Sequence, residues 1–231
     1  MAAIYLIRHG QASFHSDNYD KLSPTGIQQS KQLGTALHQR GIRFDAVYAG
    51  SMVRHAQTAQ HCMSNMGFNL TPAIIEGFNE YNHEEVLEKH RPEFAERDAL
   101  NRFLAAQNNP RKAFQIEFES ALHRWRGGEF DHEYSENWAQ FITRCNAAMD
   151  QVRSTCGEAK SIAVFSSGGP ISVATGQCLG LADSHIAELS WSLMNCSITC
   201  LLFNSEKITL RYFNDFAHFE VNADKSMLTY R

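Results

Sequence analysis

A continuous apolar run at residues 4–7 constrains the fold most strongly, because the polar triplet Arg8-His9-Gly10 follows it at once. A run of strand-forming residues without polar alternation is typical of a strand buried on both faces. Residues 161–165 form a second run of this kind, followed by Ser166-Ser167-Gly168-Gly169-Pro170. Doubly covered strands belong mainly to parallel sheets with helices on either side. The two runs therefore predict an α/β protein.

Helix signals alternate with these strands in the first third of the chain. Ser23 is a helix N-cap candidate with Pro24 in the first turn, and the expected helix ends at Gly41. Residues 45–48 read as the second strand. Ser51 is a plausible N-cap for a helix over residues 52–66, which Gly67 ends. This β-α-β-α order favours right-handed crossover connections.

Three further strands complete the expected sheet. Residues 71–75 form a short candidate, and residues 195–203 and 207–213 are joined in a hairpin-like way by Asn204-Ser205-Glu206. The hairpin predicts an antiparallel edge. The expected fold class is a three-layer α/β/α sandwich with a mostly parallel mixed sheet.

Between the third and fourth strands the strand pattern disappears. We expect a single domain over residues 1–231 that carries a helical cap insertion at about residues 81–156. The large apolar residues of this stretch favour a packed helical layer over a cofactor box; they include Phe94, Leu100, Phe103, Leu104, Phe114, Phe118, Leu122 and Trp125.

Composition excludes several classes of protein. With a formal net charge of −4 the chain has no overall basic field for nucleic acid or anionic lipid. No apolar stretch approaches the roughly 20 residues of a membrane-spanning helix. The six cysteines form no CxxC pair, and the first residues lack a signal peptide pattern, so we expect a cytoplasmic protein. Periodicity alone picks out no single exposed seam, so the oligomeric state stays open.

Polar residues follow each expected strand, at the edge where ligands of open α/β sheets bind. The four segments are Arg8-His9-Gly10, Ser51 with Arg54, Glu76 with Glu80, and Ser167-Gly168-Gly169. Guanidinium groups match phosphate oxygens in bidentate fashion, so Arg8 and Arg54 can neutralise charge without a metal. A neutral imidazole can attack phosphorus, which makes His9 the candidate nucleophile. A carboxyl group must protonate the leaving alkoxide, and Glu80 competes for that role with Glu76 and Glu84.

These motifs together resemble the histidine phosphatase superfamily, which includes the cofactor-dependent phosphoglycerate mutases. The resemblance rests on the segments 6–11, 22–26, 51–59, 78–80 and 166–169, and so spans most of the chain. It implies a phosphohistidine mechanism with His9 as nucleophile, Arg8 and Arg54 as phosphate ligands, and Glu80 as proton donor. Neither a metal nor another cofactor is expected.

One position departs from the family pattern. Family members usually have a second histidine where this chain has Ser167. A neutral hydroxyl gives phosphate a weaker hydrogen bond than a protonated imidazole does. Backbone N–H groups around Gly168 and Gly169 would still form an anion site at a helix start. We also expect His15 to restore part of the missing positive charge.

Two classes of function stay open. The first is a metal-independent phosphomonoesterase that acts on a small organic phosphate. The second is a phosphate-binding regulatory module with weak or no turnover, for which Ser167 is the main support. The same serine disfavours mutase activity, which needs a closed and strongly basic pocket. His83 and His90 are seven residues apart without an HExxH pattern, so a solvated helix face is favoured over a metal site.

Overall fold

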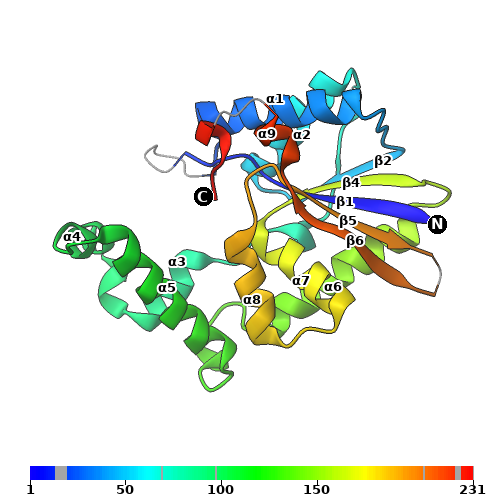
Figure 1. The fold of residues 1–231 in the computed structure, drawn as a ribbon. Coiled ribbons are helices and arrows are strands. Elements are labelled where there is room, and N and C mark those ends of the chain that lie inside the picture. Colours follow the sequence, from blue (N-terminus) through cyan, green and yellow to red (C-terminus); the bar gives the residue numbers. More distant parts are fainter. Residues whose placement is uncertain (14–19, 69, 97, 205, 222–224, 231) are drawn as a thin grey trace. The chain divides into compact units, whose positions relative to one another are not determined.

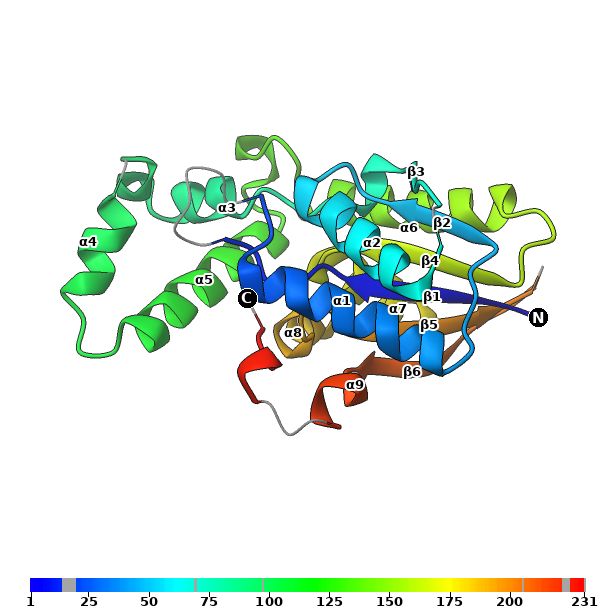
Figure 2. The same cartoon turned by 90° about the horizontal axis from the view of Figure 1, so that it is seen from above.

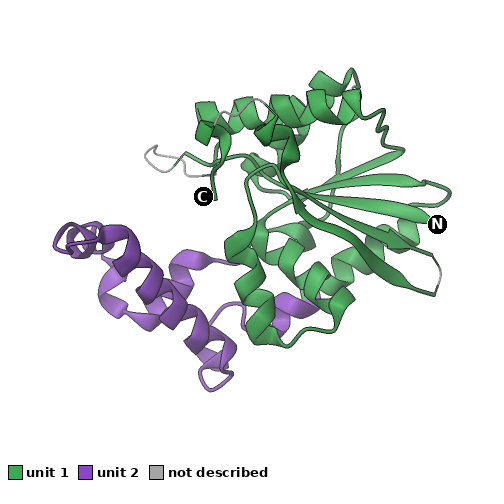
Figure 3. Ribbon diagram, in the orientation of Figure 1, with its two compact units in different colours: residues 1–80, 144–231 green, residues 81–143 purple. Residues whose placement is uncertain are grey.

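The computed structural model describes residues 1–13, 20–68, 70–96, 98–204, 206–221 and 225–230 (Figure 1). These residues form two compact units (Figure 3). The first, here the sheet unit, comprises residues 1–80 and 144–231. The second, the helical unit, comprises residues 81–143.

The sheet unit is built on six strands in the order β3-β2-β4-β1-β5-β6. Their bounds are β1 (Ala2–Arg8), β2 (Ala46–Ala49), β3 (Ala73–Ile74), β4 (Ser161–Ser166), β5 (Ile198–Phe203) and β6 (Ile208–Asp215). The four strands from β3 to β1 are parallel, and β5 and β6 add an antiparallel edge. The expected α/β sandwich with a mostly parallel mixed sheet is confirmed.

Helices cover both faces of this sheet (Figures 1 and 2). On one face α1 (Pro24–Gln39), α2 (Val53–Met66) and α9 (Ala217–Glu220) pack through residues such as Leu33, Met63 and Phe219. On the other, α7 (Gly168–Leu179) and the later turns of α6 (Trp138–Thr155) pack through residues such as Ile171 and Val152. Helix α8 (Asp183–Ser192), which the sequence pattern did not predict, follows α7.

The two N-terminal helices begin in different ways. Ser23 caps α1 as predicted, since its hydroxyl accepts from Gly26 N at 3.0 Å. The expected cap of α2 by Ser51 is wrong. Instead Val53 N donates to the carboxylate of Asp20 at 2.7 Å, and Ser51 pairs with Asn79. A carboxylate from a distant loop thus takes the place of a local cap.

The helical unit contains α3 (His83–His90), α4 (Ala99–Ala105), α5 (Pro110–Arg126) and the start of α6, with short 3-10 turns at Pro92–Ala95 and Asp131–Glu133. Its centre is aromatic: the ring of Trp125 lies 4.8 Å from Tyr81, 5.2 Å from Trp138 and 5.6 Å from Phe141. The predicted packing role of Phe118, Leu122 and Trp125 agrees with their burial. Within the described part of the chain no helix combines the length and hydropathy needed to span a membrane.

Candidate active site

His9 lies at the carboxyl end of β1 and is 7% exposed. Its Nδ1 is 2.7 Å from the carbonyl oxygen of Gly10. Because a carbonyl only accepts, Nδ1 carries the proton, and Nε2 keeps the lone pair. Burial lowers the pKa of His9 well below its ordinary value, and the charges of Arg54, Arg8 and His55 lower it further. The ring is therefore a neutral imidazole whose Nε2 carries a lone pair.

The backbone of His9 is held on both sides. Its N–H donates to Ser166 O on β4 at 2.9 Å, and its carbonyl accepts from the amide of Asn195 at 3.0 Å. A partly buried chain of side chains extends from Asn195, since Thr229 donates to Asn195 at 2.9 Å and Gln29 donates to Thr229 at 2.7 Å. This network, which no sequence motif indicated, fixes the position of His9.

Helix α2 is tied to the turn after β1. Gly10 N donates to the hydroxyl of Thr58 at 3.0 Å, and that hydroxyl donates to Arg54 O at 2.7 Å. A Cβ on Gly10 would lie 2.5 Å from Gly26 O, so this glycine is required by backbone packing against α1. The Arg-His-Gly triplet and the Thr of the α2 motif are thus one structural unit.

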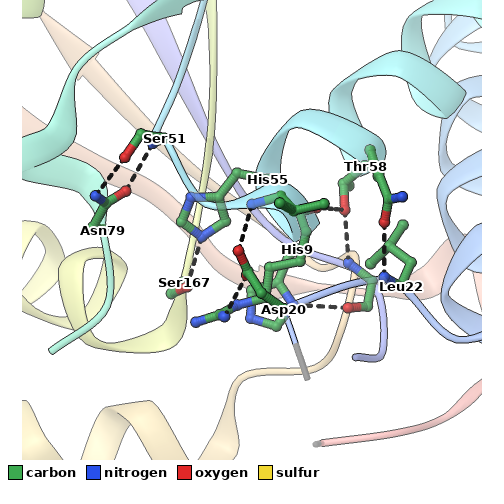
Figure 4. Close-up of polar contacts among 12 residues, drawn as sticks. His9, Asp20, Leu22, Ser51, His55, Thr58, Asn79 and Ser167 are labelled. Carbon is green, nitrogen blue, oxygen red and sulfur yellow. Dashed lines mark hydrogen bonds and ion pairs between the residues drawn. The ribbon is translucent and has the colours of Figure 1, made fainter. Parts of the chain in front are cut away.

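Two guanidinium groups lie near His9. Arg54 is 5% exposed, and its Nη1 contacts Asp20 Oδ1 at 2.8 Å (Figure 4). Arg8 Nη1 donates to Leu193 O. Both arginines are close enough to His9 to lower its pKa. The contact with Asp20 engages Nη1 of Arg54 and orients its guanidinium, whose planar fork matches the oxygens of an anion.

The loop between β4 and α7 brings Ser167 and the start of α7 to the side of Arg8. Ser167 is fully buried and precedes Gly168, the first residue of α7. A Cβ on Gly168 would lie 3.9 Å from Arg8 Nε, which places this helix start beside the guanidinium. Glu80 Oε2 accepts from Gly169 N at 3.1 Å. The helix N-terminus thus already holds one carboxylate.

Helix α2 contributes a second imidazole that the sequence reasoning did not single out. His55 is fully buried, and its Nε2 lies 2.7 Å from Ser167 Oγ. Its ring centroid is 5.7 Å from that of His9 (Figure 4). A signal was present: His55, Ala59, Cys62 and Met66 are spaced to share one helix face, and that face is buried. A polar residue on it needs a specific partner.

The structure therefore brings together most of the residues selected from the sequence. His9, Arg54 and Arg8 are neighbours, as are Gly168 and Arg8, and Glu80 and Gly169. His15 lies outside the described residues. Glu76 and Glu84 are exposed, and Glu84 is in the helical unit. Among the residues that the structure describes, no group of three or more His, Cys, Asp or Glu side chains has the geometry of a metal site.

Comparison with protein families gives a match over residues 4–216 to the model of the histidine phosphatase superfamily, branch 1. The chain belongs to the histidine phosphatase superfamily. The resemblance inferred from the sequence motifs, which include Arg8-His9-Gly10 and residues 51–59, is confirmed by this match. The solved structures that are similar to the chain include phosphatases and a mutase.

Solved structures of this superfamily share the fold. The chain is similar to a putative alpha-ribazole-5′-P phosphatase from Escherichia coli, with a TM-score of 0.64 and 21% identity over 93% of this chain and 96% of that one. It is similar to a phosphoserine phosphatase mutant from Entamoeba histolytica in complex with phosphoserine, with a TM-score of 0.63 and 18% identity over 94% of this chain and 99% of that one. It is also similar to a phosphoglycerate mutase from Bacillus anthracis, with a TM-score of 0.64 and 16% identity over 94% of each chain.

Curated relatives match only a segment. The mitochondrial serine/threonine-protein phosphatase Pgam5 of Drosophila mojavensis is 37% identical over 70 residues, which is 29% of this chain and 24% of that protein. The match thus spans about a quarter of the length of that relative.

Proposed function

We propose that the protein is a metal-independent phosphomonoesterase that uses His9 as a nucleophile on a small organic phosphate. The observation that carries the proposal is the state of the His9 ring: it is buried and neutral, its Nδ1 is committed to Gly10 O, and guanidinium groups lie close by. Membership of a superfamily of phosphatases and mutases supports the same chemistry.

The first step forms a bond between His9 Nε2 and phosphorus and breaks the ester bond to the leaving oxygen. Arg8 and Arg54 neutralise the charge on the equatorial oxygens. Glu80, in its protonated form, gives its proton to the departing alkoxide. The products of this step are an alcohol and a phosphohistidine.

The second step returns the enzyme to its starting state. Water attacks phosphorus, the P–N bond breaks, and the electron pair returns to Nε2. Glu80 accepts the proton of the attacking water, so the same carboxyl group acts as acid and then as base. Splitting one displacement into two is the reason a nucleophile is useful here.

The test is turnover of a panel of phosphomonoesters in the presence of EDTA. The panel contains phosphoserine, phosphoglycerate, p-nitrophenyl phosphate and a phosphoserine peptide. We expect release of inorganic phosphate by the native protein and a loss of at least about 10³-fold in His9→Ala. The matched control is His61→Ala, a histidine on the same helix as Arg54 but outside this site, which should keep native turnover.

A quench in base, where a P–N bond survives, identifies the intermediate. Labelled phosphate on His9 supports the proposal. Phosphate binding without label or turnover would instead indicate the regulatory module, and transfer of label to a second acceptor in place of water would indicate a mutase.

A further inference from the structure

His55 and Ser167 form a buried polar pair beside His9. Both side chains are fully buried, and they come from separate elements, α2 and the β4–α7 loop. Their contact of 2.7 Å between Nε2 and Oγ is short for a nitrogen–oxygen hydrogen bond. Burying a histidine and a hydroxyl is costly unless they satisfy each other, and an apolar pair would hold these elements together more simply.

The backbone is shaped around the His55 ring. A Cβ on Gly50 would lie 2.4 Å from His55 Nδ1 and 2.6 Å from Asn79 Oδ1. Any residue larger than glycine at position 50 would therefore displace the imidazole or the amide that pairs with Ser51. The ring is thus held in one place with Nε2 directed at Ser167 (Figure 4).

Charged groups surround the pair. Burial and the charge of Arg54 lower the pKa of His55 well below its ordinary value, while the Gly50 backbone raises it. Arg8, at the end of β1, adds a second permanent positive charge close to His9. Carboxylates face the same edge from two elements: Asp20 on Arg54, and Glu80 on Gly169 N, two residues after Ser167. In the absence of a further anion, His55 is neutral.

We propose that His55 is a positioning residue that takes up a proton through Ser167 when a phosphate group binds at His9. This inference rests on the proposed function and names how the same site handles the charge of its substrate. A hydroxyl can donate to an unprotonated Nε2 or accept from a protonated one, so Ser167 can work in both directions.

The proton has a defined source and destination. A phosphate monoester loses its second proton near pH 6, so a share of substrate arrives as the monoanion at neutral pH. Its P–OH proton passes to Ser167 Oγ while the Ser167 proton passes to His55 Nε2. The result is a phosphate dianion that accepts from Ser167, and an imidazolium that holds that hydroxyl in place. No other reactant is required.

The direct test follows the His55 ring when inorganic phosphate binds. NMR of that ring in the native protein shows whether it gains the proton, and calorimetry in buffers of different ionisation enthalpy shows how much of that proton comes from solution when the phosphate arrives as the dianion. We expect protonation of His55 in the native protein when phosphate is added. Unchanged His55 ring shifts at saturating phosphate would overturn the inference.

Variants separate this role from a structural one. His55→Gln keeps a polar partner for Ser167 but cannot carry charge, so phosphate affinity should fall about 10- to 100-fold. The fall should be largest at low pH, because only the native pair gains a proton there. His61→Gln, on the same helix, is the matched control and should match the native pH profile. Should His55→Gln not fold, Ser167→Ala gives the same comparison.

A rescue arm completes the design. The double variant His55→Gln with Ser167→His returns an imidazole to the β4–α7 loop and should recover phosphate affinity above that of His55→Gln alone. The outcomes remain distinct from those of the proposed function: labelled His9 with an unaltered pH profile in His55→Gln overturns only this inference. Absence of both label and turnover overturns the proposed function itself.

Discussion

The two units of the molecule bury different materials. The helical unit fills its centre with the rings of Tyr81, Trp125 and Trp138. Three of its described arginines, Arg91, Arg102 and Arg124, are paired with carboxylates, as with Arg124 and Glu133 at 2.8 Å. At the carboxyl edge of the sheet, by contrast, the sheet unit buries polar and charged groups, with His9, Arg54 and His55 close together.

This difference separates a region stabilised by apolar packing from a region that buries polar and charged groups. Aromatic burial stabilises a fold directly, at about 25 cal/mol per Å² of apolar surface. Buried groups of like charge repel each other and lose hydration, so they weaken a fold unless an anion joins them. The lowered pKa values of His9 and His55 record that cost. We therefore expect this edge to bind an anion.

The largest effect we expect is on activity, from the buried arginine of the sheet unit. Arg54→Ala should lower kcat/KM by about 10³-fold or more, because the guanidinium stabilises charge in the transition state. The matched control is Arg124→Ala, whose guanidinium contacts Glu133 and Tyr134 within the helical unit. It should stay within about threefold of native activity, because the contacts of Arg124 lie within the helical unit and do not include His9. The measurement is the initial rate on the phosphomonoester that the native protein hydrolyses best. Equal losses of kcat/KM in both variants would contradict the distinction between the two units.

The next largest effect is on stability, from the aromatic centre of the helical unit. Trp125 is 1% exposed, and its indole N–H donates to Glu136 O at 2.8 Å. Trp125→Ala should lower the free energy of unfolding of this unit by about 3–5 kcal/mol, through lost burial and a cavity. Ile116, on the same helix α5 but 52% exposed, is the control, and Ile116→Ala should change it by less than about 0.5 kcal/mol.

Hydrogen exchange read separately for each unit gives the answer. Faster exchange confined to residues 81–143 in Trp125→Ala is the expected pattern. If the strands of the sheet unit lost protection to the same degree, the two units would share one cooperative core and the comparison would need revision.

Much of the sheet unit could be predicted because its signals are local. The apolar runs of β1 and β4 and the cap at Ser23 depend on neighbours in sequence, and the structure has them as expected. Residues directly after a strand are similarly easy to place, which is why His9 and Ser167 could be selected.

The rest depends on contacts between distant segments. The cap of α2 comes from Asp20, 33 residues before Val53, so the local candidate Ser51 was wrong. Asn195 acts on His9 across 186 positions, and no motif links the two. His55 was visible in the α2 motif, but its role follows only from the place of Ser167. Tertiary partners, which a single sequence does not display, decide all three.

The smallest effect we expect is on the acid dependence of stability, from a histidine of the sheet unit outside the candidate site. His218 of the sheet unit packs its ring 4.1 Å from Phe219, and burial lowers its pKa from 6.5 to about 4, with Asp215 opposing this shift. Between these two values the unfolded chain binds the proton and the folded one does not, so stability is complete above about pH 6.5 and falls as the pH drops towards 4. At about 1.4 kcal/mol per pKa unit, the loss from this residue is about 3 kcal/mol.

His218→Leu should remove that loss, whatever its stability at pH 7. Urea unfolding at several pH values measures it, and His9 and His55, which are unchanged in the variant, cancel in the difference from the native protein. Parallel acid profiles for the native protein and His218→Leu would show that this ring is protonated as readily in the folded chain as in the unfolded one. Burial of histidine would then carry no cost at this position, and the contrast between the units would be confined to the edge that holds His9.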